Sequence, residues 1–287
     1  MVYQNTKSIL KKQGLAPAKK LGQNFLVHRH TAERIVELAG ITNSDTVLEI
    51  GVGLGALTTP LAAVAKQVIG LEADSGIIRL HKEQKSLPKN VQLIHQDVLK
   101  ADFQELADSF GGRLKIIANL PYSISSPFLF KLIKHHDLVD FAVVMLQKEV
   151  GLRLLAKSGT KEYGVPTVLM ASCAEVKMVM QVKPEEFHPR PKVDSAIVRL
   201  SFQPMPERVQ KIGPIDYQFL KKVVNGAFGQ RRKTLLNALS ATGLLDKHEL
   251  AECLAATRLA PLIRAERLEL EDFVRLSRAI AKRRDSQ

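Results

Sequence analysis

The sequence contains few cysteines and no long apolar segment. Its two cysteines among 287 residues, Cys173 and Cys253, are far apart and lack the spacing of metal ligands. We therefore expect no disulfide framework and no metal site, and a reducing cytoplasm is the expected location. No apolar run approaches the roughly 18 residues of a membrane span, and there is no secretory signal with an apolar core. Association with a membrane is therefore not expected.

Internal repeats and low-complexity tracts are also absent from the sequence. Hydrophobic residues make up 45% and charged residues 25% of the chain, which is an ordinary globular composition. These values exclude a disordered chain, a fibre and a collagen-like repeat. At roughly 150 residues per domain, the length indicates about two domains, enough to bury a core without disulfides.

Positive charge is in excess and is concentrated at the two ends of the chain. There are 42 Lys and Arg residues against 29 Asp and Glu, a formal net charge of +13. By segment the net charge is +6 for residues 1–34, +1 for residues 35–203 and +6 for residues 204–287. Because Lys and Arg neutralise phosphates and release counterions, the basic ends favour a nucleic-acid partner. General solubility and an anionic membrane surface are the alternative explanations.

The pattern of apolar residues divides the chain into an arm and two domains. Residues 1–30 are basic and interrupted by glycine and proline, which predicts an arm. In residues 31–203, short apolar runs alternate with helical patterns, which predicts an α/β domain with a parallel sheet covered on both faces. The predicted strands are residues 46–50, 67–71, 91–94, 115–118, 141–146, 172–180 and 195–202. The last two are expected at an antiparallel edge. Residues 204–287 are predicted to form a small, all-helical, basic domain.

A glycine cluster follows the first predicted strand. Gly51, Gly53 and Gly55 precede a helical pattern, and glycine there lets the backbone approach a ligand while the helix offers its N–H groups. Glu72 lies 21 residues after Gly51, at the end of the next predicted strand. A carboxylate at that place can accept from both hydroxyls of a ribose. The combination favours an adenosine-containing ligand without a 2′-phosphate, and the alternative is a plain turn with a surface glutamate.

The next two predicted strands also end in polar residues. Asp97 can accept from the exocyclic amine of adenine, although a lone Asp there is more often a helix cap. The following strand ends in Asn119-Leu120-Pro121-Tyr122. The Asn119 side-chain oxygen and a backbone carbonyl can accept both hydrogens of a target adenine amine, which directs its lone pair at an electrophile. Pro121 stiffens the turn, and Tyr122 offers a face for stacking. In isolation this tetrapeptide would be a strand end with an aromatic core residue.

Two further segments are candidate contacts with nucleic acid. In the Pro-rich loop, Phe187 could close over a base, and Arg190 and Lys192 could hold phosphates. In the helical domain, three adjacent cations stand beside an apolar helical pattern: Arg231, Arg232 and Lys233. Phosphate contact is favoured there over a solvated helix end.

Together these motifs resemble those of the small-subunit (16S) ribosomal RNA adenine dimethyltransferases, relatives of the erythromycin-resistance methylases. The matching segments run in family order and are residues 20–26, 49–58, 96–98, 119–122, 147–150, 187–195 and 227–239. The resemblance implies a Rossmann-like class I methyltransferase fold and S-adenosyl-L-methionine as the methyl donor. It implies transfer of two methyl groups to N6 of each of two adjacent adenosines near the 3′ end of 16S RNA, within the immature small ribosomal subunit. We expect a monomer.

The resemblance also implies roles for individual residues. The expected cofactor-binding residues are Asn24, Leu26, Gly51, Gly53, Gly55, Glu72, Asp97, Val98 and Asn119. The expected catalytic residues are Asn119, Leu120, Pro121, Tyr122 and Phe187. The expected RNA-binding residues are Lys19, Lys20, Arg190, Lys192, Arg231, Arg232 and Lys233. Val52 and Gly151 depart from the family pattern of proline and alanine without removing a ligand, and Gly151 in a predicted helix is expected to cost a little stability.

Two other functions are kept as alternatives. One is a large-subunit (23S) RNA adenine N6-methylase of the antibiotic-resistance type, and segments 187–195 and 227–239 favour the small-subunit enzyme over it. The other is a non-catalytic ribosome assembly factor, against which the intact Asn119–Tyr122 motif and Glu72 argue.

Overall fold

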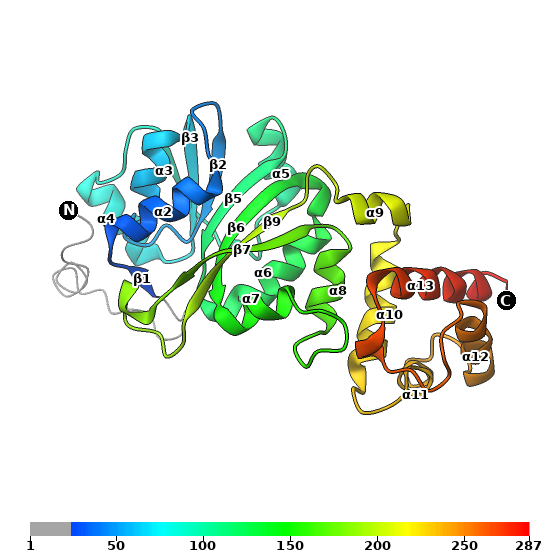
Figure 1. Ribbon diagram of the computed structural model, residues 1–287. Coiled ribbons are helices and arrows are strands. Elements are labelled where there is room, and N and C mark those ends of the chain that lie inside the picture. Colours follow the sequence, from blue (N-terminus) through cyan, green and yellow to red (C-terminus); the bar gives the residue numbers. More distant parts are fainter. Residues whose placement is uncertain (1–23, 287) are drawn as a thin grey trace. The chain divides into compact units, whose positions relative to one another are not determined.

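The structure is a computed structural model that describes residues 24–286, and it forms two compact units (Figure 1). The first, called the sheet unit, contains residues 24–151 and 176–204. The second, called the helical unit, contains residues 152–175 and 205–286. Lys19, Lys20 and most of the predicted arm lie outside the described residues.

A seven-stranded sheet forms the centre of the sheet unit. In spatial order its strands are β4 (Val91–His95), β3 (Gln67–Glu72), β2 (Thr46–Ile50), β5 (Leu114–Asn119), β6 (Val139–Gln147), β9 (Ser195–Ser201) and β7 (Glu175–Val182). The strands from β4 to β6 are parallel, and β9 pairs antiparallel with β6. A separate antiparallel pair joins β1 (Phe25–Leu26) to β8 (Phe187–His188). The predicted parallel sheet with an antiparallel strand beyond it is therefore present.

Helices cover the sheet on both sides (Figure 1). They are α2 (Arg29–Ala39), α3 (Thr58–Val64), α4 (Ser75–Gln84), α5 (Phe103–Phe110), α6 (Tyr122–Lys134) and α7 (Lys148–Leu154), with 3-10 turns at His136–Leu138 and Pro184–Glu186. Ile35 of α2 and Leu61 of α3 pack in one buried cluster with Val47, Val68 and Val143 of three strands. Burial on both faces explains why these strands are nearly continuous apolar runs instead of alternating patterns.

Two of the helices contain residues that argue against a helix, namely α6, which sequence patterns did not indicate, and α7, where a helix around Gly151 was expected. Pro127 lies inside α6, where it removes a backbone donor. Gly151 lies inside α7, and a Cβ added there would come within 3.2 Å of Ala196 and Val198 on β9. Glycine at this position therefore has a packing reason, because the helix passes close to the strand. Glycine has a low helix propensity, but a larger residue at this position would crowd Ala196 and Val198.

The helical unit is built from α8 (Val165–Ala171), α9 (Glu207–Ile212), α10 (Tyr217–Gly229), α11 (Leu235–Ser240), α12 (Lys247–Ala256) and α13 (Leu270–Arg284), with a 3-10 turn at Ala265–Arg267. Asp216 caps α10, and Asp246 caps α12 in a reciprocal pair with Glu249. Phe219, Val223 and Val224 on one face of α10 are buried, as their helical spacing predicted.

The segment of residues 152–175 groups with the helical unit, whereas the sequence pattern placed it before a boundary at residue 203. Tyr163 shows the reason. Its hydroxyl donates to the Leu268 carbonyl over 2.7 Å, and its ring lies edge-on to Phe228 with centroids 6.0 Å apart. Contacts between residues so distant in the chain leave no periodic signal, so a boundary drawn from patterns does not include them.

Candidate active site

The carboxyl ends of the parallel strands bring four predicted residues to one edge of the sheet. Gly51 follows β2, Glu72 ends β3, Asp97 follows β4 and Asn119 ends β5. The chain passes from β2 to β3 on one side and returns to β5 on the other, and the crevice at such a switch in strand order is where open α/β sheets bind ligands.

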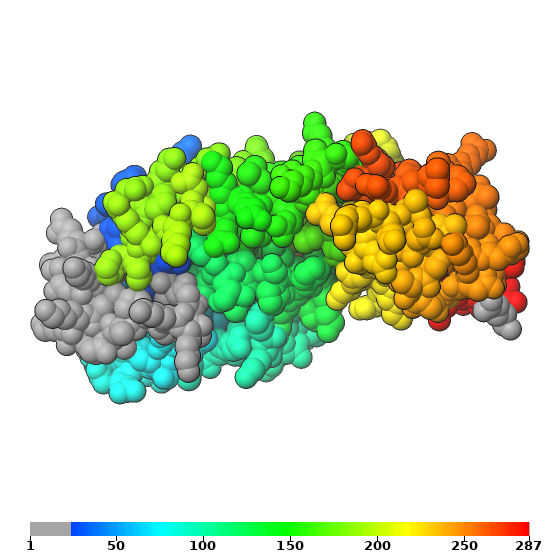
Figure 2. Space-filling model, turned by 90° about the horizontal axis from the view of Figure 1, so that it is seen from below, coloured from blue at the N-terminus to red at the C-terminus, as the bar shows by residue number. Residues whose placement is uncertain are grey.

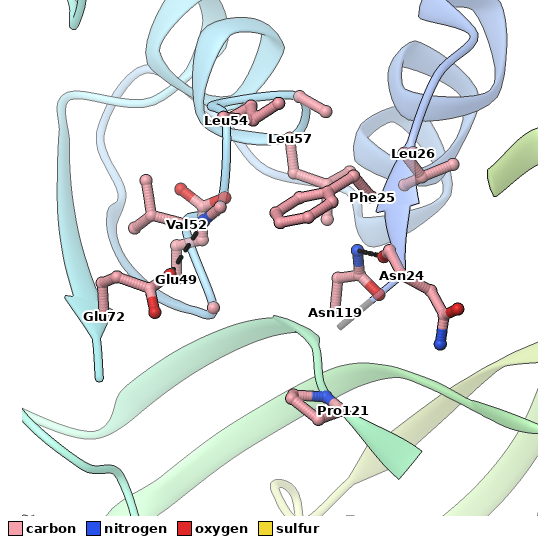
Figure 3. A pocket seen from close by; sticks show the side chains of 13 residues that line it. Asn24, Phe25, Leu26, Glu49, Val52, Leu54, Leu57, Glu72, Asn119 and Pro121 are labelled. Carbon is pink, nitrogen blue, oxygen red and sulfur yellow. Dashed lines mark hydrogen bonds between the residues drawn. The ribbon is translucent and has the colours of Figure 1, made fainter. Parts of the chain in front are cut away.

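A pocket opens at this switch point (Figure 3). It contains about 570 Å³ of empty space, which includes open solvent at its mouth. Its lining residues are Asn24, Phe25, Leu26, Glu49, Gly51, Val52, Gly53, Leu54, Ala56, Leu57, Glu72, Asn119 and Pro121. Glu72 and six other expected cofactor or catalytic residues therefore line one pocket. The six are Asn24, Leu26, Gly51, Gly53, Asn119 and Pro121.

The glycine loop between β2 and α3 requires glycine at two places. Gly51 has a φ of 80°, and a Cβ there would lie 2.7 Å from the Asn119 carbonyl oxygen. Gly53 has a φ of 53°, and a Cβ there would lie 3.1 Å from the ring of Phe25. The absence of side chains lets the loop lie directly against the end of β5 and beneath β1. The floor of the pocket depends on this close approach.

The carboxylate of Glu72 is held by backbone donors. Its Oε2 accepts from the Gly53 N–H and its Oε1 from the Asp74 N–H, each over 2.9 Å (Figure 3 shows the first bond). Burial raises the pKa of Glu72, and these two bonds oppose that effect. A carboxylate has about four acceptor sites, so these two bonds leave acceptor capacity for ligand hydroxyls. The predicted place for two ribose hydroxyls is thus fixed before a ligand arrives.

His81 on α4 holds the same loop from the other side and was not indicated by the sequence. Its Nε2 lies 2.7 Å from the Gly53 carbonyl oxygen, and its Nδ1 lies 2.7 Å from the Ser86 hydroxyl. Because a carbonyl only accepts, Nε2 must carry the proton. Burial lowers the pKa of His81, which favours the neutral ring. Gly53 is therefore held at its N–H by Glu72 and at its carbonyl by His81.

Glu49 is a second buried carboxyl of the pocket, and no site role was predicted for it. The residue is fully buried, and neither of its carboxyl oxygens has a hydrogen-bond partner in the part of the chain from residue 24 to 286. Burial raises the pKa of Glu49 to about 8, with a further contribution from the charge of Glu72. The side chain is consequently protonated and neutral at pH 7.

Three expected cofactor residues lie at the same edge but not among the residues that line this pocket: Gly55, Asp97 and Val98. The Gly55 N–H donates to the Val52 carbonyl over 2.9 Å and closes the turn of the glycine loop. Asp97 accepts from the Leu99 N–H over 2.9 Å through one oxygen and so closes a turn, whereas the cap of the following helix α5 is Asp102 and not Asp97. Contact of Asp97 with an adenine amine stays a prediction for its other oxygen. Val98 is buried.

The Asn119–Tyr122 segment forms the wall between β5 and α6. The Asn119 Nδ2 donates to the Asn24 carbonyl over 3.4 Å, which turns the side-chain oxygen away from that bond (Figure 3). Leu120 is buried in the core, whereas Pro121 lines the pocket. The Tyr122 hydroxyl lies 2.6 Å from the hydroxyl of Ser195, the first residue of β9, and burial raises the pKa of Tyr122. The position of this ring is thus set by a partner far away in the sequence.

Phe187 occupies a place that its predicted role did not anticipate. It pairs with Leu26 between β8 and β1, is 3% exposed and packs in the same buried cluster as Leu26. Closing over a base therefore requires part of the ring to be uncovered. Its contact with the target base stays a prediction.

The predicted RNA-binding cations differ in what holds them. Arg190 is exposed and lies 3.6 Å from Glu185, and Lys192 is exposed in the same loop, which stands at the surface in yellow-green in Figure 2. Arg232 and Lys233 are exposed beside α11. The Arg231 guanidinium instead donates to the carbonyls of Lys161 and Tyr163, over 2.8 and 3.0 Å, and so fastens a loop.

Residues 24–286 contain neither a cluster of metal-ligating side chains nor a candidate membrane span. Within that range no three His, Cys, Asp or Glu side chains are placed to hold a metal ion together. No helix within it has the length and apolar character needed to cross a bilayer.

Comparison with known sequences identifies the family. A model of the ribosomal RNA adenine dimethylase family matches residues 16–282. The chain is 51% identical to the ribosomal RNA small subunit methyltransferase A of Desulfotalea psychrophila, over 96% of this chain and 95% of that protein. It is 42% identical to the protein of the same name from Geobacter metallireducens, over 93% of this chain and 97% of that one.

Solved structures agree with the sequences. A dimethyladenosine transferase from Plasmodium falciparum superimposes with a TM-score of 0.70 at 29% identity, covering 88% of this chain and 95% of that one. The 23S rRNA methyltransferase ErmE gives a TM-score of 0.63 at 24% identity, covering 90% of this chain and 100% of that one, and shows the fold alone. The predicted class I methyltransferase fold with a helical C-terminal region is thereby confirmed. The chain belongs to the ribosomal RNA adenine dimethylase family, whose enzymes use S-adenosyl-L-methionine as methyl donor.

Proposed function

We propose that this protein dimethylates N6 of two adjacent adenosines near the 3′ end of 16S RNA, in the immature small ribosomal subunit. The observation that carries the proposal is the position of Asn119 and Pro121 in the wall of the pocket that also contains the Glu72 carboxylate. The names of the relatives support the small subunit as the target. We also propose that the enzyme acts as a monomer in the cytoplasm.

The pocket residues fit S-adenosyl-L-methionine by their chemistry. Glu72 would present its remaining acceptor capacity to a pair of ribose hydroxyls, and Gly51 lines the pocket and lets the glycine loop lie against the Asn119 carbonyl. Val52, Leu54 and Leu57 supply apolar surface. Asn24 and Leu26 would lie at the methionine end, and Asp97 would accept from the adenine amine. When bound, the cofactor supplies a methyl group on a positively charged sulfur.

The chain's own contribution to the transfer is to prepare the target amine. An adenine amine is a poor nucleophile because its lone pair is delocalised into the ring. Asn119 Oδ1 and a backbone carbonyl of the same turn would accept its two hydrogens, which favours a tetrahedral nitrogen with its lone pair directed at the methyl group. The Tyr122 ring, fixed by its bond to Ser195, would support the base by stacking. The proton can leave to water after the new N–C bond has formed, so no general base is needed.

Exposed cations would hold the RNA backbone. Arg190 and Lys192 lie on the sheet unit, and Arg232 and Lys233 lie on the helical unit. Lys19 and Lys20 are proposed to contribute from the segment outside the described residues. Arg231 is assigned mainly to its loop, because its guanidinium already donates to two carbonyls.

The test uses small ribosomal subunits from a strain that lacks the gene for this protein. The subunits are incubated with the protein and labelled S-adenosyl-L-methionine, and their RNA is then analysed by mass spectrometry. The proposal predicts two labelled N6,N6-dimethyladenosines in one fragment near the 3′ end. Labelled large-subunit RNA would instead identify a 23S methylase. An absence of label with intact RNA binding would identify an assembly factor.

A further inference from the structure

One short segment contacts three parts of the candidate active site. Residues 24–31, called the strap, contain β1 and the first turn of α2. The Asn24 carbonyl accepts from the Asn119 side chain, and the Phe25 ring packs over Gly53. Leu26 pairs with Phe187. The strap therefore joins the glycine loop, the target-amine residue and the predicted base-contacting loop.

Glu186, the residue before Phe187, fastens the strap by three contacts. Its Oε2 accepts from the Thr31 hydroxyl over 2.6 Å and lies 2.9 Å from the His28 Nδ1. Its backbone carbonyl accepts from the Val27 N–H over 2.9 Å. The Glu186 side chain is only 20% exposed, whereas that of His28 is 47% exposed. A partly buried carboxylate with two side-chain partners on one segment is well placed to fix that segment.

Other charged groups near this carboxylate are already engaged with different partners or lie farther away. His30 Nε2 is 4.0 Å from Glu186 Oε2. Arg29 bonds to Glu33 on its own helix, and Glu185 lies 3.6 Å from Arg190. Glu186 is not among the residues that line the pocket. Any effect of Glu186 on the cofactor is therefore indirect, and its side-chain bonds to Thr31 and His28 lead to the strap.

We propose that Glu186 is a positioning residue that fastens the strap and thereby couples the cofactor site to the site of the target base. Release of the carboxylate frees the start of α2 from the loop that contains Phe187. The strap is then held by β1 pairing and by the bond from the Val27 N–H to the Glu186 carbonyl, and the Asn24 carbonyl and the Phe25 ring are held less firmly against Asn119 and Gly53. The role of the strap at the cofactor rests on the proposed function.

The experiment uses the full chain and compares Glu186→Ala, Glu186→Gln and the matched control Glu185→Gln. Calorimetry with S-adenosylhomocysteine should show affinity about tenfold weaker for Glu186→Ala, because hydrogen bonds that hold the strap are lost. Glu186→Gln keeps an acceptor for Thr31 and should recover part of the affinity. Glu185→Gln removes a charge from the next residue, which faces Arg190, and should bind like the wild type.

Hydrogen exchange gives a readout that does not depend on catalysis. Peptides covering residues 24–31 should exchange faster in Glu186→Ala, while those covering β5 and β6 keep wild-type protection. Thr31→Val removes one bond from the other side of the contact and should move affinity and exchange in the same direction by a smaller factor, which keeps the test available if Glu186→Ala folds poorly.

Wild-type affinity together with wild-type exchange of residues 24–31 in Glu186→Ala and Thr31→Val would overturn the proposal. Faster exchange with unchanged affinity would overturn the coupling to the cofactor site. Failure of the proposed function has a different signature, namely a wild-type protein that binds S-adenosylhomocysteine but leaves small-subunit RNA unlabelled.

Discussion

The pocket of the sheet unit and the basic surface of the helical unit are held in different ways. Around the pocket, polar side chains bond to backbone groups: Glu72 to two N–H groups, His81 to a carbonyl and Asn119 to another. On the helical unit, Arg232 and Lys233 are exposed cations on a turn. The comparison suggests a prearranged site for a small cofactor and an adaptable surface for a long polyanion.

Arg231 differs from its neighbours Arg232 and Lys233 in the bonds that its side chain makes within the protein. It belongs to the cationic run, yet its guanidinium donates to the carbonyls of Lys161 and Tyr163. Such a residue contributes to the surface indirectly, by fixing the loop on which Lys161 stands. A charge in a basic run is therefore assigned to RNA only after its internal bonds are known.

The largest expected effect concerns the fixed site. Glu72→Ala removes the proposed acceptor of two ribose hydroxyls and leaves the N–H groups of Gly53 and Asp74 without their partner. Since a hydrogen bond to a charged group is worth about 1.5–3 kcal/mol, S-adenosylhomocysteine affinity should fall about 100-fold by calorimetry. Glu83→Ala removes the same charge from an exposed position on α4 and should have little effect. Equal affinity of both variants would remove Glu72 from the site.

The second prediction concerns the buried carboxyl of Glu49 and the pH dependence of the free energy of unfolding. Its pKa in the folded protein is about 8, against an ordinary value of 4.5. Between these values the folded state retains a proton that the unfolded state has lost, so stability decreases as pH rises. From about pH 5.5 to about pH 7, wild type should lose about 2 kcal/mol more of its unfolding free energy than Glu49→Gln. Urea unfolding at the two pH values measures this, and parallel pH profiles would contradict an uncharged Glu49.

The sequence predicted the parts of the candidate site that stand at strand ends. Gly51, Glu72 and Asn119 each follow or end a strand, and the parallel order of strands brings strand ends together. His81 and Ser195 were missed because their value depends on a partner 28 and 73 residues away, at Gly53 and Tyr122. Nothing in their local sequence distinguishes them from ordinary helix and strand residues.

Long-range contacts also limited how much of the fold could be predicted from the sequence. The alternation of strands and helices was visible because burial of a parallel sheet leaves continuous apolar runs. Helix α6 was hidden by Pro127, and the grouping of residues 152–175 with the helical unit depends on long-range contacts such as Tyr163 with Phe228. Local pattern thus indicates elements, whereas their grouping depends on packing between distant residues.

A smaller effect is expected at Tyr122, which lies in the sheet unit beside the pocket residue Pro121. Tyr122→Ala should lower methyl transfer at least tenfold with little change in cofactor affinity, because base stacking is worth about 1–3 kcal/mol. Tyr122→Phe and Ser195→Ala each remove the 2.6 Å contact between the two hydroxyls but keep the ring, so each should be milder. Single-turnover rates and calorimetry separate the two quantities. A Phe variant as slow as the Ala variant would show that the hydroxyl, and not the ring, is needed.

The smallest expected effect concerns the exposed cations. Replacing Arg232 and Lys233 by Ala should weaken binding of matched and unrelated RNAs by similar factors, because contacts with phosphates do not identify bases. The slope of log affinity against log salt should flatten by up to about one unit for each lost contact, and cofactor affinity should stay constant. Filter binding across a salt series measures the slope. The control is a double variant at Lys247 and Lys282, which removes the same charge from other exposed positions of the helical unit. Arg231→Ala should instead lower the melting temperature, since two carbonyls lose their donor. If the Arg232 and Lys233 variant and its control flatten the slope equally, only net charge matters and these two residues have no specific place on the RNA path.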